Sequence, residues 1–137
     1  MKEEIDFSFV TQSPVVFLEG GLGLLEEAER LVQMLVNHRI YPFVFEELYD
    51  NPELLITLKW IKPKTIVLGT TGVYRDKIDH CVKMFKIAEH IPDNVIFLFG
   101  EDDMKKEIKE FKALKPSMKV FAIHVLDDED YRLTEIK

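Results

Sequence analysis

The sequence predicts an α/β domain built as a three-layer sandwich around a mostly parallel, five-stranded sheet. Three apolar runs without polar alternation favour this class, because the strands of a parallel sheet are covered on both faces. Each run leads into a loop, and these three loops hold all six glycines of the chain. Segments of helical periodicity separate the runs, and strands that alternate with helices imply a parallel sheet. The three runs are residues 15–18, 66–68 and 95–99.

Composition limits the class of protein further. A length of 137 residues suits one domain, residues 1–137, with a core of its own. No apolar run approaches the ~18 residues of a membrane helix, and the acidic first residues lack the apolar region of a secretory signal. The single cysteine, Cys81, fits a reducing cytoplasm, and the net charge of −7 argues against general nucleic-acid or membrane binding. Abundant Lys and Glu with few Asn and Gln are typical of a thermophilic source.

The first third of the chain holds two strand patterns, a helix and then another strand. Residues 4–10 alternate, with Ile5, Phe7 and Phe9 on one side, which predicts a half-buried strand at a sheet edge or in a dimer contact. The first core strand, 15–18, follows. A stripe of apolar residues at i, i+3/i+4 and i+7 then predicts a helix from residue 22 or 23 to residue 37. Residues 41–46 alternate again and form the second core strand.

The remaining elements alternate regularly. Asn51 and Pro52 predict the start of a second helix, because a capping side chain precedes a proline at the first helical position. This helix stops before Pro63, and we expect Trp60 near its end to be partly buried by packing. The central strand is the run 66–68, within the stretch 65–72 that leads into a polar loop. The later elements are helices at 75–91 and about 104–114, core strands at 95–99 and 119–126, and a terminal hairpin through the acidic turn 127–130 to the strand 131–136.

We expect the flavodoxin-like strand order 2-1-3-4-5 for the five core strands, with antiparallel additions from both termini. In this order the first and third core strands are neighbours, and their connections leave on opposite faces of the sheet. Ligands of open α/β sheets bind outside the carboxyl ends of the strands at such a switch point. The loops after these two strands would therefore flank a ligand crevice.

The loop Gly20-Gly21-Leu22-Gly23 lies between a strand and a helix, as phosphate-binding loops do. It matches neither the dinucleotide fingerprint nor the Walker pattern, and neighbouring acids such as Glu19 would repel a phosphate. A tight turn that lets the helix pack close to the strand explains the same glycines. The candidate ligand-binding residues of this loop are Gly20, Gly21 and Gly23.

The loop from residue 70 to residue 75 offers hydroxyls, backbone amides and an arginine. Tyr74 could stack on a ring and Arg75 could neutralise an anionic group, although turn and capping chemistry explains the loop equally well. Thr71-Gly72 with a following aromatic residue resembles the flavin-binding loops of flavodoxins. The phosphate loop of that family is absent after the first strand, so no flavin or other cofactor is expected. The candidate ligand-binding residues here are Thr70, Thr71, Gly72, Tyr74 and Arg75.

Two further resemblances concern acidic residues. The cluster 101–103, Glu-Asp-Asp, resembles the acidic pocket of response-regulator receivers, but no aspartate ends the third core strand, and helix capping explains the cluster. The early half of the chain is similar to TIR-like nucleotide-binding domains, with Glu46-Glu47 ending the second strand and Glu53 on the next helix. That resemblance implies an NAD glycohydrolase with Glu53 or Glu47 as the catalytic carboxylate; Glu19 is a third candidate. Solvated helix-start acids are the alternative interpretation.

The sequence therefore favours a cytosolic binding or regulatory domain that takes a small polar or nucleotide-like ligand between residues 19–23 and 69–75. A TIR-like NAD hydrolase and a ligand-free protein-interaction module are the alternatives. The four histidines are scattered, and no pair has metal-ligand spacing, so no metal is expected. The alternating terminal strands predict a homodimer with Phe7, Phe9 or Tyr131 buried at the twofold contact. In the monomeric alternative, the two terminal strands pair with each other.

Overall fold

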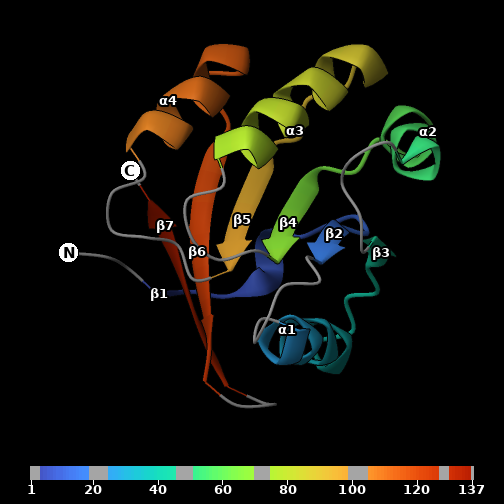
Figure 1. Cartoon of the computed structure of the whole chain (residues 1–137). Helices are drawn as coiled ribbons and strands as arrows, with labels where there is room; N and C mark the ends of the chain where they lie inside the picture. Colours follow the sequence, from blue (N-terminus) through green and yellow to red (C-terminus); the bar gives the residue numbers. More distant parts are fainter. Residues whose placement is uncertain are drawn as a thin grey trace.

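The computed structural model describes residues 4–18, 25–45, 51–69, 75–98, 105–126 and 130–136. These residues form a mixed α/β fold, with α-helices on a mostly parallel, Rossmann-like sheet (Figure 1), so the prediction of an α/β domain with a mostly parallel sheet is confirmed. The strands are β1 (Glu4–Ile5), β2 (Val15–Leu18), β3 (Phe43–Phe45), β4 (Thr65–Gly69), β5 (Asn94–Leu98), β6 (Lys119–Val125) and β7 (Tyr131–Ile136). The α-helices are α1 (Leu25–Asn37), α2 (Pro52–Ile61), α3 (Arg75–Ala88) and α4 (Lys105–Leu114), and a 3₁₀ helix, η1 (Phe7–Phe9), follows β1.

The sheet has the strand order β1-β7-β6-β5-β4-β2-β3. Parallel pairing joins β3 to β2, β2 to β4, β4 to β5 and β5 to β6. At the other side of the sheet, β7 runs antiparallel to β6, and β1 runs antiparallel to β7. Both termini therefore add their strands to the same edge, beyond β6.

Apolar layers cover both faces of the sheet, which explains the runs of consecutive apolar residues in its central strands. Helices α2, α3 and α4 lie on one face, and α1 lies on the other (Figure 1). Phe111 of α4 and Phe85 of α3 are fully buried in the first layer against Phe97 of β5. In the second layer, Leu31 of α1 is buried together with Ile123 of β6.

The strand predicted for residues 4–10 is wrong beyond Ile5. Residues Phe7–Phe9 instead form η1, and the Oδ1 atom of Asp6 caps it by accepting a hydrogen bond of 2.9 Å from the backbone nitrogen of Ser8. An aspartate side chain that bonds the backbone two residues on competes with strand pairing in this way. The 3₁₀ turn nevertheless buries Phe7, which is 6% exposed.

The N-terminal segment, residues 5–10, completes the layer beside α1. The ring of Phe9 stacks on Phe121 of β6 at 4.6 Å with an interplanar angle of 15°, and the ring of Phe7 lies 4.6 Å from that of Tyr131. Burial and the neighbouring Asp6 carboxylate raise the pKa of Tyr131 above its ordinary value. The terminal strands β1 and β7 pair within one chain, and the aromatic side chains expected at a twofold contact pack inside it.

Helix α2 begins as predicted and presents one unexpected side chain. The Asn51 side chain accepts a hydrogen bond of 3.2 Å from the Leu54 nitrogen, and Pro52 takes the first helical position. The expectation that Trp60 is partly buried is wrong, because its side chain is 74% exposed. Leu54 and Leu58 form the buried side of α2, and Trp60 lies outside that side.

Cys81 occupies the inner side of α3, where it is 1% exposed. Burial raises the pKa of its thiol to about 12, so the group stays protonated and packs as a small apolar side chain. The structure therefore places Cys81 in the core, as its position on the apolar stripe predicts.

Candidate functional site

The predicted ligand crevice belongs to the carboxyl ends of β2 and β4. These strands are neighbours, and Leu18 at the end of β2 is in register with Gly69 at the end of β4. Helix α1, which follows β2, and helix α3, which follows β4, lie on opposite faces of the sheet (Figure 1). This is the arrangement that a switch-point site requires. Most of the predicted site residues lie outside the described residues: Glu19, Gly20, Gly21, Gly23, Glu47, Thr70, Thr71, Gly72 and Tyr74.

Two of the predicted site residues belong to described helices. Arg75 is the first residue of α3. Glu53 stands in the first turn of α2, where an acidic residue favours the helix dipole, and its side chain is exposed. Its backbone carbonyl accepts a hydrogen bond of 2.8 Å from Thr57 Oγ1. The position of Glu53 is that of a solvated residue at a helix start, and it lacks the burial that usually tunes a catalytic carboxylate.

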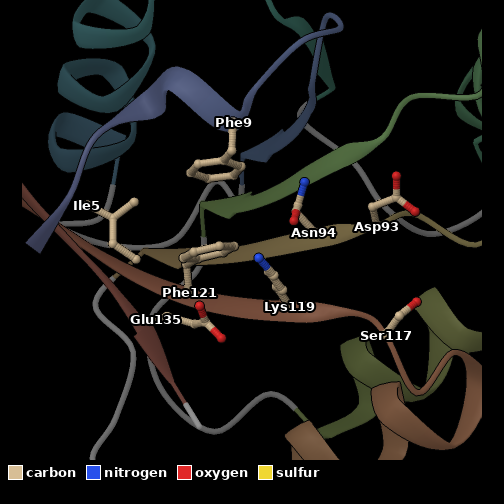
Figure 2. A pocket seen from close by; sticks show the side chains of 8 residues that line it. All are labelled: Ile5, Phe9, Asp93, Asn94, Ser117, Lys119, Phe121 and Glu135. Carbon is tan, nitrogen blue, oxygen red and sulfur yellow. The ribbon is translucent and has the colours of Figure 1, made fainter. Parts of the chain in front are cut away.

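A hollow of about 340 Å³ lies at the opposite ends of the strands, their amino ends, between the sheet and the N-terminal segment (Figure 2). We call these amino ends of the strands the amino edge of the sheet. Asn94 and Lys119 are the first residues of the neighbouring strands β5 and β6, and they are in register with each other. Across the hollow, Ile5 and Phe9 come from the N-terminal segment (Figure 2). The remaining lining residues are Asp93, Ser117, Phe121 and Glu135.

The chemistry of this hollow is mixed. Phe9 and Phe121 form an aromatic wall, while Lys119 supplies a cation and Glu135 a carboxylate from the adjacent strand. A small molecule with both an anionic and a cationic group, and an apolar part to lie against the aromatic wall, would match these groups. Sequence reasoning missed this hollow, because its lining residues come from four separate stretches of the chain.

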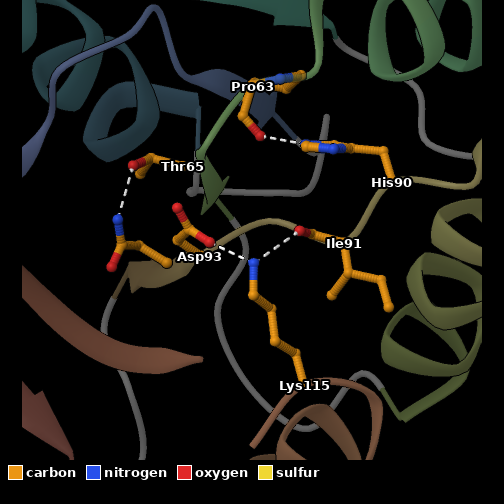
Figure 3. A network of polar contacts seen from close by, with 7 residues as sticks. Pro63, Thr65, His90, Ile91, Asp93 and Lys115 are labelled. Atoms are coloured by element: carbon orange, nitrogen blue, oxygen red, sulfur yellow. Dashed lines mark hydrogen bonds and ion pairs between the residues drawn. The ribbon is translucent and has the colours of Figure 1, made fainter. Parts of the chain in front are cut away.

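A polar network fixes the connections at the same amino edge (Figure 3). Lys115, just after α4, forms an ion pair with Asp93, and its Nζ atom lies 3.5 Å from the Ile91 carbonyl oxygen. His90 Nε2 donates a hydrogen bond of 2.6 Å to the Pro63 carbonyl oxygen. The Asp93 carbonyl in turn accepts a bond of 2.9 Å from the Lys119 nitrogen. These bonds tie the turn before β5 to the starts of β4 and β6, and so hold one wall of the hollow in place.

The ion pair makes the stability of the domain depend on pH. The hydrogen bond from Lys115 is the main cause that lowers the pKa of Asp93 below its ordinary value of 3.8. A lowered folded-state pKa stabilises the fold above the unfolded-state value, and this contribution disappears as the pH falls through the folded-state value. Because both side chains are partly exposed, we expect Asp93→Asn to cost less than about 1 kcal/mol at neutral pH. This cost should shrink as the pH falls below 3.8, and it should vanish once the pH is below the lowered folded-state pKa of Asp93.

Urea unfolding of Asp93→Asn and of the unmodified protein, at neutral and at acidic pH, measures this difference. Asp79→Asn, which changes an exposed aspartate of α3, serves as the matched control and should change little at either pH. A difference between Asp93→Asn and the unmodified protein that persists at acidic pH would contradict the assignment to this ion pair.

An apolar groove of about 430 Å³ separates α2 from α3. Its residues are Asn51, Pro52, Leu55, His80, Lys83, Met84 and Ile87. No group of three or more metal-ligating side chains occurs in the part of the chain that the structure describes, and no helix in that part is long and apolar enough to cross a membrane. Comparison of the chain with protein-family models, curated proteins and solved structures found no match.

Proposed function

We propose that this chain is a cytoplasmic, flavodoxin-like domain that binds a small polar or nucleotide-like ligand at the carboxyl ends of β2 and β4. The observation that supports the proposal is the switch point: adjacent strands end in register at Leu18 and Gly69 and lead to helices on opposite faces. The parallel pairing β3-β2-β4-β5-β6 supports the order 2-1-3-4-5 for the core strands. Arg75, at the start of α3, is the cation that would meet an anionic group.

Ligand binding is a better proposal than NAD hydrolysis. A TIR-like hydrolase needs a carboxylate that faces the crevice, and the only candidate carboxylate among the described residues, Glu53, is solvent-exposed. An exposed glutamate at a helix start keeps an ordinary solvation shell, which does not favour it as a catalytic group. Incubation with NAD followed by chromatography would detect the hydrolase directly.

The amino-edge hollow is a second candidate site, with a different class of ligand. Lys119 and Glu135 on neighbouring strands, beside the aromatic pair Phe9 and Phe121, favour a zwitterion with an apolar part, such as an apolar amino acid. One candidate site lies at the carboxyl ends of the strands and the other at their amino ends. Substitutions at one of them should therefore not disturb the other.

A thermal-shift screen with nucleotides, phosphorylated cofactors and apolar amino acids tests both sites together. A ligand at about 100 times its Kd stabilises the folded state by about 2.7 kcal/mol, which raises the Tm by roughly 5–10 °C. We expect a nucleotide-like compound to give this rise. Arg75→Ala should abolish it, and Lys119→Ala should leave it unchanged.

The two substitutions control for each other. A rise with an amino acid that is lost in Lys119→Ala but kept in Arg75→Ala would move the binding function to the hollow at the amino edge. The absence of a shift with every compound, confirmed by calorimetric titration, would contradict both binding proposals and favour the interaction-module alternative.

A further inference from the structure

Six large apolar side chains are exposed at and beside the β3 edge of the sheet, which is the edge opposite the chain termini. The most exposed are Trp60 at 74%, Tyr41 at 65% and Ile56 at 57%. A large exposed apolar patch on a soluble domain usually marks an interaction site. The six residues, here called the edge patch, are Tyr41, Phe43, Val44, Ile56, Trp60 and Ile61.

Hydrogen bonds show that the two parts of the edge patch are neighbours. The Phe43 nitrogen donates a bond of 2.9 Å to the Pro14 carbonyl oxygen, and Gln12 Nε2 donates a bond of 3.1 Å to the Ile61 carbonyl oxygen. Gln12 and Pro14 belong to the same short stretch before β2. The end of α2, with Trp60 and Ile61, therefore lies beside the start of β3.

The helical position of Trp60 explains why it is exposed. Leu55 lines the groove between α2 and α3, so this side of α2 faces its neighbouring helix. Trp60 is five residues further along, which places it about 140° around the helix from Leu55. Its side chain therefore points away from α3, on the side of α2 that carries no other described helix.

Among the residues that the structure describes, no strand pairs with the outer side of β3. β3 is the last strand in the sheet order, and its pairing with β2 uses the Phe43 nitrogen. Because successive residues of a strand turn their backbone groups to opposite sides, the N–H and C=O groups of Val44 face away from β2. An edge strand of this kind is a template for pairing with another strand.

We propose that the edge patch is the contact surface of a homodimer in which two β3 strands pair antiparallel about a twofold axis at Val44. The N–H and C=O groups of Val44 then exchange two hydrogen bonds between the copies, and the sheet continues from one copy into the other. Phe43 and Phe45 become cross-strand neighbours across the axis, an aromatic pairing that stabilises sheets. The exposed sides of the two α2 helices, with Trp60, lie over this junction.

The size and symmetry of the surface favour a second copy as the partner. With about 200 Å² for a whole aromatic side chain, the exposed fractions amount to roughly 600 Å² of apolar surface per copy. A standard interface buries about 800 Å² per partner, so the edge patch supplies most of what a stable dimer needs. Antiparallel pairing of an edge strand with its own copy is self-complementary, as a twofold interface must be.

The charge around the edge patch distinguishes a second copy from an acidic partner. Lys59, Lys62 and Lys64 are exposed near the end of α2, Glu53 is exposed at its start, and the chain as a whole carries a net charge of −7. Two copies therefore repel each other through their net charge, and added salt screens this repulsion. Self-association should strengthen or stay constant with added salt, whereas binding of an acidic partner would weaken.

The experiment uses the full chain, and two measurements report on the same surface. Analytical ultracentrifugation up to about 100 µM should give twice the mass of the 16.1 kDa chain. Trp60 is the only tryptophan, so tryptophan emission, excited selectively over that of the four tyrosines, reports on the edge patch alone. We expect its emission to move to shorter wavelength as the concentration rises, in parallel with the mass. Trp60→Ala should raise the dimer Kd at least tenfold.

Ile87→Ala is the matched control, because Ile87 is an exposed apolar residue of α3 at 64%, outside the edge patch. It should leave the dimer Kd and the fluorescence shift unchanged. A monomeric mass at every concentration would overturn the proposal. A dimer whose Kd does not respond to Trp60→Ala, or whose tryptophan emission does not move, would also overturn it and place the contact elsewhere.

Discussion

Replacing Phe111 with alanine should lower the free energy of unfolding by about 3–5 kcal/mol, the largest loss expected from a single side chain of this fold. Phe111 of α4 is 0% exposed, and its ring centroid lies 6.4 Å from that of Phe85 and 6.1 Å from that of Phe97. The side chain thus joins α4 to both α3 and β5. Its removal leaves a cavity between three elements, which the surrounding backbone closes only in part.

Urea unfolding followed by circular dichroism measures this loss, with Ile87→Ala as an exposed control expected to change stability by no more than about 0.5 kcal/mol. The slope of the unfolding free energy with urea should stay the same, because the extent of the fold does not change. A loss below about 1 kcal/mol would show that α4 does not depend on this contact.

Replacing Phe7 with alanine should cost about 3 kcal/mol and lower the Tm by roughly 10 °C. Phe7 is 6% exposed, and it packs against Tyr131 of β7 and, with a centroid distance of 5.7 Å, against His38 after α1. In this way η1 takes part in the layer that α1 alone would leave incomplete. Phe7 belongs to the same buried cluster as Leu133 of β7, so loss of its ring weakens the packing of that cluster.

Phe9→Ala is the comparison for this prediction. Phe9 is only half-buried and stacks on Phe121 alone among the described aromatic rings, so its loss should be the smaller of the two. Thermal unfolding of both variants shows which of the two loses more stability. An effect of Phe7→Ala no larger than that of an exposed substitution would show that the N-terminal segment is an appendage rather than part of the core.

The elements that local chemistry specifies could be predicted from the sequence. The β5 run is apolar throughout because both faces are covered, and the Asn51 cap and Pro52 locate the start of α2. The error at residues 4–10 arose because Ile5, Phe7 and Phe9 satisfy the two-residue period of a strand. The competing signal was the Asp6 side chain, which bonds Ser8 and turns the chain.

Features that depend on neighbours distant in sequence could not be predicted in the same way. The amino-edge hollow is lined by Phe9, which stacks on Phe121, and by Lys119, two residues earlier on β6. Phe9 and Phe121 are far apart in the sequence, so their contact could not be predicted from it. Trp60 is exposed because α3 packs against a different side of α2. The sequence near the end of a helix does not indicate on which side a neighbouring helix will pack. The carboxyl-edge site remains a prediction, based on the glycine-containing loops and on the register of Leu18 with Gly69.

The pairing of β1 with β7 has a consequence for how the chain folds during synthesis. Glu4 lies opposite Thr134, and Ile5 lies opposite Leu133. The residues of β1 therefore cannot pair until β7, more than a hundred residues later in the chain, has been synthesised. The parallel strands β2 to β6 can assemble as they emerge, but the layer over β6 stays open meanwhile. Phe7 and Phe9 are exposed to other chains and to chaperones throughout that interval. The final closure of this layer is a long-range step, which slows folding relative to the local helices.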